Sequence, residues 1–186
     1  MNDHEVNIFP TPIWGYVLSS EKYQAEDYLE KILELHSAEP SANKSNAGGG
    51  WQSQDNLHEE PLFKEFVNNT LIKSIGQTIL KDYGIENPVV QSMWANVNGK
   101  HSFNYQHTHE GCLSGVFYLQ VPKNSGRLIF VNPNIRSDIH TIRSKNYPID
   151  PQHLACIVFP SWLEHYVEPN TSEENRVSIS FNIGML

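Results

Sequence analysis

Apolar positions in the first half of the chain recur with the spacing of two amphipathic helices. Between residues 20 and 40 an apolar stripe runs through Glu and Lys residues, and Pro40 is expected to end the helix. A second helix is predicted over residues 61–83, because Pro61 suits a first helical turn and Gly84 suits a helix end. The Ser-, Asn- and Gly-rich segment between the helices predicts a loop.

From residue 88 onward the pattern changes to short alternating or wholly apolar runs separated by turn residues. An extended segment is also predicted at residues 6–18, and Lys123–Gly126 has the composition of a hairpin turn. The predicted strands are Val89–Asn98, Leu113–Val121, Arg127–Val131, Leu154–Phe159, His165–Glu168 and Arg176–Ile183. Two helices followed by antiparallel strands predict a mostly-β fold, with a jelly-roll core and flanking helices.

The bulk properties favour one globular domain. A length of 186 residues is enough to bury a sizeable core. We expect residues 1–87 to supply an extended segment and supporting helices, and residues 88–186 to form the β-core. The formal charge of −8 and the lack of a Lys/Arg cluster argue against binding to nucleic acid or to an anionic membrane.

Three features predict a cytoplasmic protein. No apolar run approaches the roughly 20 residues needed to span a bilayer. The acidic segment Met1–Glu5 lacks the basic and apolar regions of a signal peptide. Cys112 and Cys156 have no Cys-x-x-Cys spacing, and we interpret them as reduced, partly buried thiols within strands.

The candidate chemistry lies in three histidines. His107 and His109 are one residue apart, and His165 lies far downstream. In an extended strand, residues i and i+2 point to the same face, so His107 and His109 can aim two imidazoles at one point. A third imidazole from another strand would complete a three-ligand face on a metal and leave open positions, as catalysis requires. Imidazole suits Fe, Zn, Cu and Ni, so the residue types do not choose the metal.

A polar series opens the last predicted strand. The polar positions alternate with apolar ones and are Arg176, Ser178, Ser180 and Asn182. This period implies one face packed on a core and the other facing water or a polar cavity. At a surface, Arg176 would pair with a neighbouring glutamate, whereas in a cavity Arg176 and Ser178 would suit a carboxylate-bearing ligand. The cavity interpretation needs His165 nearby, which antiparallel pairing across the Glu168–Asn175 turn would provide.

Two spaced motifs then carry a resemblance to a known family. Phe-Pro-x-x-x-x-His ends at His165, and Arg-x-Ser-x-x-Phe-Asn begins at Arg176. With these motifs, residues 91–183 resemble the 2-oxoglutarate/Fe(II)-dependent dioxygenase superfamily, specifically its group of 2OG-Fe(II) oxygenases. The other matching runs are Trp94–Asn96, His107–His109 and Leu113–Leu119.

The resemblance implies a double-stranded β-helix, which is a cupin-like jelly roll, with Fe(II) held at one end of the barrel. It implies that His107 and His165 are metal ligands and that Arg176 with Ser178 holds the far carboxylate of 2-oxoglutarate. Tyr118 would add a hydrogen bond to the same carboxylate. The implied activity is that of an oxidoreductase that also consumes O2.

The second ligand position departs from the wider superfamily, which has a carboxylate where this chain has His109. The narrower group resembles the chain more closely, since His-x-His is found there, and His109 is then the second ligand. Glu110 could substitute, although one residue further along a strand it should point to the opposite face. Glu164 is a further neighbouring carboxylate that we rank lower.

The function expected from this resemblance is hydroxylation of a small-molecule or peptide substrate, with conversion of 2-oxoglutarate to succinate and CO2. One alternative is a cupin-type dioxygenase or hydrolase that uses a three-histidine metal without 2-oxoglutarate. Another is a non-catalytic jelly-roll binding module. The acidic surface and abundant aromatic residues fit a homodimer as well as a monomer.

Overall fold

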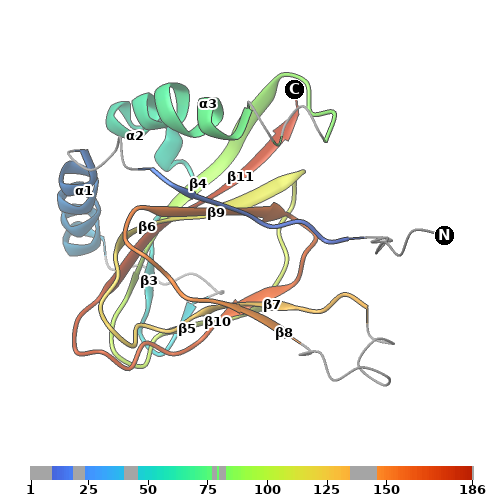
Figure 1. Cartoon of the computed structure of the whole chain (residues 1–186). Helices are drawn as coiled ribbons and strands as arrows, with labels where there is room; N and C mark the ends of the chain where they lie inside the picture. Colours follow the sequence, from blue (N-terminus) through green and yellow to red (C-terminus); the bar gives the residue numbers. More distant parts are fainter. Residues whose placement is uncertain are drawn as a thin grey trace.

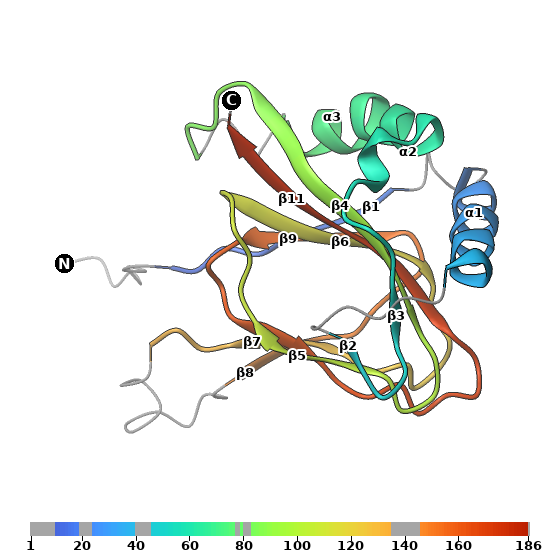
Figure 2. The same cartoon turned by 180° about the vertical axis from the view of Figure 1, so that it is seen from behind.

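The computed structural model describes residues 10–18, 24–39, 46–76, 79, 83–134 and 146–185. Two antiparallel sheets face each other in this part of the chain, and the helices lie on the outer side of one of them (Figure 1). The view from behind shows the same two layers of strands (Figure 2). The predicted mostly-β fold with a jelly-roll core and flanking helices is therefore confirmed.

The helices fall in the two predicted regions, but the second region is not regular. Helix α1 spans Gln24–Ala38 and buries Tyr28 and Ile32. The second region consists of the 3₁₀ turn η2 (Leu57–Glu59), α2 (Pro61–Phe66), the π-helical stretch η3 (Val67–Leu71) and α3 (Ile72–Ile75). Pro61 occupies the first turn of α2, where its missing N–H has no intrahelical acceptor to lose.

The sheet next to the helices has the strand order β1-β9-β6-β11-β4-β3. Its strands are β1 (Trp14–Val17), β3 (Trp51–Gln52), β4 (Pro88–Asn98), β6 (Leu113–Gln120), β9 (Ala155–Pro160) and β11 (Arg176–Met185). The opposite sheet has the order β2-β5-β10-β7-β8. Its strands are β2 (Asn46–Ala47), β5 (Phe103–His107), β7 (Leu128–Val131), β8 (Asn146–Ile149) and β10 (His165–Val167). Each predicted strand is present, and β2, β3, β5 and β8 were not predicted.

Strand β11 separates a hydrophobic core from a polar pocket. Its apolar positions belong to the cluster that also contains the buried residues of the helices, and are Val177, Ile179, Phe181 and Ile183. The rings of Phe66 on α2 and Phe117 on β6 stack in this cluster with their centroids 5.3 Å apart. Each such buried side chain contributes about 2 kcal/mol to folding. The alternate positions Arg176, Ser178 and Ser180 line a pocket between the two sheets, as the period-two pattern predicted.

Two predicted strand pairings are wrong. Lys123–Gly126 was expected to join a hairpin, but β6 and β7 on either side of it belong to opposite sheets. The same holds for β10 and β11 on either side of the Glu168–Asn175 turn. In both places the chain crosses between the sheets. The two crossing segments lie in close contact with each other at Gly126 and Glu168. Gly126 has φ +86°, and a Cβ there would lie 2.1 Å from the carbonyl oxygen of Glu168.

Two further expectations concern the state of the two cysteines and the presence of a membrane-spanning helix. Cys156 is buried within β9, whereas Cys112 is half-buried just before β6, and both are unbonded thiols. Burial raises the pKa of the Cys156 thiol to about 12. Among the helices that the structure describes, none is long and apolar enough to cross a membrane.

Candidate metal centre

The three candidate histidines meet at one end of the space between the sheets. His107 is the last residue of β5 and pairs directly with His165, the first residue of β10. His109 lies beyond the end of β5, where its backbone N–H donates to the carbonyl of Ser161 at 2.9 Å. Nitrogen atoms of the three rings lie within 4.8 Å of one another. The two neighbouring histidines therefore converge as predicted, although only His107 does so from within a strand.

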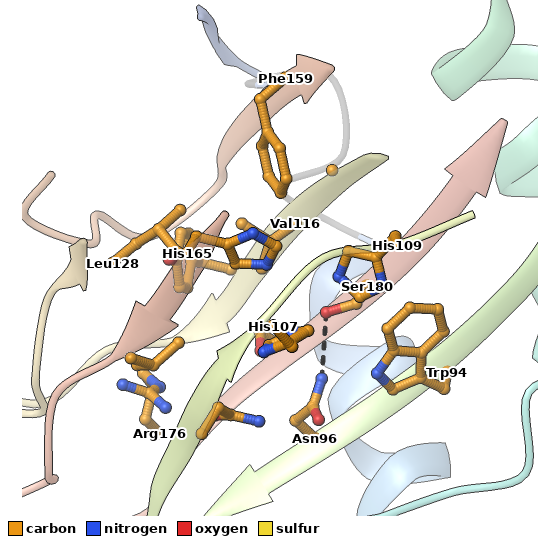
Figure 3. Close-up of a pocket in the computed structure, with 15 residues that line it drawn as sticks. Trp94, Asn96, His107, His109, Val116, Leu128, Phe159, His165, Arg176 and Ser180 are labelled. Atoms are coloured by element: carbon orange, nitrogen blue, oxygen red, sulfur yellow. Dashed lines mark hydrogen bonds between the residues drawn. The ribbon is translucent and has the colours of Figure 1, made fainter. Parts of the chain in front are cut away.

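Backbone hydrogen bonds fix the ring orientation of two of these histidines. Nδ1 of His165 lies 2.9 Å from the carbonyl oxygen of Leu163, and Nδ1 of His107 lies against the carbonyl oxygen of Tyr105. A carbonyl oxygen only accepts, so in each neutral ring Nδ1 carries the proton and donates it. The lone pair is then on Nε2, which is the atom left to bind a metal. Figure 3 shows the three rings gathered around one point.

The electrostatics of the cluster keep its rings neutral. Burial, followed by the nearby His107, lowers the pKa of His165 to about 3. Burial also lowers the pKa of His109 to about 4 and lowers that of His107. Neutral imidazole is the form that binds metal ions, so His109 and His165 are held in the ligating state well below neutral pH.

These pKa shifts predict a pH-dependent stability of the metal-free protein. Between pH 6.5 and 4 the unfolded chain protonates His165 while the folded protein does not, so the unfolded state binds more protons. The free energy of unfolding should therefore fall as the pH drops through this range, by roughly 1 kcal/mol per pH unit from His165 alone. Thermal unfolding followed from pH 7 to pH 4 measures this slope.

Two variants separate the contribution of the cluster from general acid destabilisation. His165→Gln should show a shallower fall in Tm with decreasing pH than the wild type. His153→Gln should follow the wild type, because His153 lies outside the cluster and contacts the carbonyl of Leu119 instead. Equal slopes for the wild type and His165→Gln would show that His165 is not held neutral by the fold.

The donor set fits a transition metal with open coordination positions. Three imidazoles without a carboxylate suit Fe(II), Zn(II), Ni(II) or Cu(II), and only three protein ligands leave room for others. Neither neighbouring carboxylate joins the cluster among the residues that the structure describes. Glu110 lines an outer cleft, and Glu164 is exposed in the turn before β10.

Arg176 lies in the same pocket as the histidines but on the opposite sheet. It is 2% exposed, and its Nη1 donates to the carbonyl of Ser125 at 2.7 Å. Within the described ranges no carboxylate pairs with it, and burial lowers its pKa. Because a buried charge is costly unless it is paired, this guanidinium is poised to bind an anion.

Two further predicted residues line this pocket beside Arg176. Tyr118 on β6 is paired in register with Ser178 on β11, and both are buried. Burial raises the pKa of Tyr118 to about 12, so its hydroxyl remains a hydrogen-bond donor at neutral pH. The pocket therefore holds a cation and two hydroxyl groups at one end and three imidazoles at the other.

Sequence reasoning missed two polar residues next to Arg176. Asn98 is fully buried, and neither polar atom of its side chain has a partner. The hydroxyl of Ser125 is also buried without one. The alternation of Trp94, Asn96 and Asn98 along one predicted strand could have revealed Asn98. No local signal in the sequence marks Ser125.

An open cleft of about 720 Å³ adjoins the pocket on the side of the histidines. It shares His107, His109 and Trp94 with the pocket, so a molecule in the cleft would lie against the candidate metal ligands. The other residues that line the cleft are all polar: Gln52, Asp55, Gln91, Ser92, Thr108, Glu110 and Asn182.

Comparison with known proteins agrees with this fold and site. Residues 92–182 match the model of the family described as "Putative 2OG-Fe(II) oxygenase". No curated protein sequence matches the chain.

Three solved structures show how widely the fold is shared. The α-ketoglutarate-dependent epimerase SnoN from nogalamycin biosynthesis is 14% identical, with a TM-score of 0.72 over 94% of this chain and 77% of its own. HygX from Streptomyces hygroscopicus, with nickel and 2-oxoglutarate bound, is 12% identical, with a TM-score of 0.68 over 94% and 83%. A Pseudomonas putida prolyl-4-hydroxylase is 13% identical, with a TM-score of 0.67 over 95% and 94%.

The jelly-roll fold and the three-histidine cluster are compatible with a non-haem metal centre. The family match over residues 92–182 points to a 2-oxoglutarate/Fe(II)-dependent oxygenase. This assignment favours an enzyme over the alternative of a non-catalytic binding module.

Proposed function

We propose that the protein is an Fe(II)- and 2-oxoglutarate-dependent oxygenase that hydroxylates a substrate bound in the outer cleft. In the overall reaction, a substrate C–H bond, O2 and 2-oxoglutarate give a C–OH bond, succinate and CO2. One observation carries the proposal: three neutral imidazoles and an unpaired buried guanidinium share a single pocket.

Nε2 of His107 and of His165, together with one ring nitrogen of His109, would hold Fe(II), since these atoms converge. When bound, Fe(II) supplies the redox chemistry with O2 and a binding site for the keto-acid end of 2-oxoglutarate. Arg176 is suited to the far carboxylate, because its planar guanidinium group can donate two parallel hydrogen bonds to the two carboxylate oxygens. The family assignment and the pocket's charge both support this pair of cofactors.

Tyr118 and Ser178 are proposed to complete the co-substrate site through their hydroxyl groups. Both line the pocket beside Arg176, and the Tyr118 hydroxyl stays protonated because burial raises its pKa to about 12. Aromatic and aliphatic side chains also line the pocket and would exclude water from a bound keto acid. They include Leu128, Phe159 and Val116.

The assay that tests this function measures succinate. Protein supplied with Fe(II), 2-oxoglutarate and O2 should form succinate slowly even without substrate, through uncoupled turnover. The variant His107→Ala should form no more than a reaction lacking protein. If the wild type forms no more succinate than that variant, the proposed function is wrong.

A second candidate function rests on His109. A three-histidine site carries one negative charge less than a site with a carboxylate ligand, which suits a metal dioxygenase that does not use 2-oxoglutarate. In that case Arg176 would bind a carboxylate of the substrate itself. Succinate formation separates the two candidates, because only the first consumes 2-oxoglutarate.

A further inference from the structure

Asn98 is an unusual buried residue. It is 0% exposed, yet neither Nδ2 nor Oδ1 of its side chain has a hydrogen-bond partner among the residues that the structure describes. Other buried asparagines of the chain are satisfied: Asn170 and Asn182 each make several side-chain hydrogen bonds. Because an unpaired buried amide destabilises a fold, its presence here requires an explanation.

The position of Asn98 supplies that explanation. It stands directly opposite Arg176 in the antiparallel pair of β4 and β11, so the two side chains emerge on the same face about 5 Å apart. Trp94 and Asn96, at the alternate positions before it on β4, both line the pocket. Ser125, whose carbonyl accepts from Arg176, has a buried hydroxyl that is also unpaired.

Four polar groups thus lie together at this point of the fold, next to the part of the pocket that Arg176 lines. They are the guanidinium of Arg176, both polar atoms of the Asn98 amide and the Ser125 hydroxyl. Three of the four can donate hydrogen bonds, and a carboxylate accepts several at once. Donors therefore outnumber acceptors around Arg176, which suits an acceptor-only group with a negative charge, such as a carboxylate.

We propose that Asn98 is a co-substrate-binding residue whose Nδ2 donates to the carboxylate held by Arg176, with the Ser125 hydroxyl as a second donor. This inference rests on the proposed function, since the carboxylate is the far one of 2-oxoglutarate. It assigns a role to residues outside the motifs that identify the family.

A nearly isosteric substitution tests this role against a structural one. Asn98→Leu removes both polar atoms and keeps the volume. Because the amide has no partner in the fold, the metal-free variant should have a Tm equal to or above that of the wild type. Its affinity for 2-oxoglutarate should fall about 10-fold or more, as expected for a lost hydrogen bond to a charged group. The affinity is measured by calorimetric titration of 2-oxoglutarate into the Ni(II)-loaded protein.

Asn98→Asp provides an independent readout. A carboxylate at this position would pair with Arg176 and compete with the bound dicarboxylate. This variant should lose more 2-oxoglutarate affinity than Asn98→Leu while its Ni(II) affinity stays unchanged. Asn170→Leu is the matched control: Asn170 is equally buried, but its amide donates to two backbone carbonyls, so its loss should lower the Tm.

Three outcomes are decisive. A stable Asn98→Leu variant with weakened 2-oxoglutarate binding supports the inference. Unchanged 2-oxoglutarate affinity in both Asn98 variants overturns it, whatever their Tm. If the Ni(II)-loaded wild type itself fails to bind 2-oxoglutarate, the proposed function fails, and this inference fails with it for that separate reason.

Discussion

Replacement of His165 by alanine is expected to weaken Fe(II) binding by more than about 100-fold. Even the residues that only orient a metal ligand typically cost 10- to 100-fold in affinity when replaced, so the loss of a ligand should exceed that range. His165 is the most buried of the three histidines, and its Nδ1–H is already committed to the carbonyl of Leu163. Anaerobic equilibrium titration with Fe(II), repeated with redox-stable Ni(II), measures the effect.

The control for this experiment is His153→Ala. His153 makes the same kind of contact, from Nδ1 to the backbone carbonyl of Leu119, but belongs to no metal-binding group in the described structure. Its replacement should leave Fe(II) affinity unchanged. Comparable affinities for the wild type and His165→Ala would contradict ligation by this histidine and would leave the cluster without its third ligand.

Replacement of Arg176 by methionine should weaken 2-oxoglutarate binding by at least about 30-fold, which corresponds to about 2 kcal/mol. Methionine keeps most of the packing of the aliphatic part of the Arg176 side chain. It removes the positive charge and the guanidinium hydrogen-bond donors. Iron affinity should stay near the wild-type value, since the imidazoles come from the opposite sheet and the loop after β5. Titration of 2-oxoglutarate into the Ni(II)-loaded protein measures the loss.

Arg176→Lys refines this prediction. Lysine retains the positive charge but lacks the planar guanidinium that can donate two parallel hydrogen bonds. The affinity of Arg176→Lys for 2-oxoglutarate should therefore lie between the affinities of the wild type and of Arg176→Met. The metal-free Arg176→Met variant loses the hydrogen bonds that Nη1 donates to the carbonyls of Ser125 and Gly126 but no ion pair of the described part of the chain, so its Tm should fall only modestly. If Arg176→Met binds 2-oxoglutarate as tightly as the wild type, the assigned role of Arg176 is wrong.

Local sequence patterns were sufficient to predict most strands of the sheet next to the helices and the convergence of the histidines. The alternation of polar and apolar residues from Arg176 along β11 predicted which face would be polar, because side chains in a strand alternate strictly. The spacing of His107 and His109 predicted that their rings would converge. The structure brings them together even though β5 ends at His107, because the following residues are held against the carbonyl of Ser161.

Pairing between distant segments could not be predicted in the same way. A Gly-containing turn such as Lys123–Gly126 shows where the chain reverses, but not whether the next strand joins the same sheet. The π-helical stretch Val67–Leu71 leaves no mark in the apolar period. The unsatisfied amide of Asn98 is likewise a property of the packed structure, since a sequence does not show which buried groups lack partners.

The central claim is that the three histidines and Arg176 together hold Fe(II) and 2-oxoglutarate in one site. Anaerobic titration of the metal-free protein with Fe(II) and then 2-oxoglutarate, followed by visible absorption, tests it most directly. We expect a charge-transfer band that requires protein, Fe(II) and 2-oxoglutarate together and that is absent in His165→Ala. Tight Fe(II) binding without such a band would contradict the claim and would favour a three-histidine dioxygenase that does not use 2-oxoglutarate.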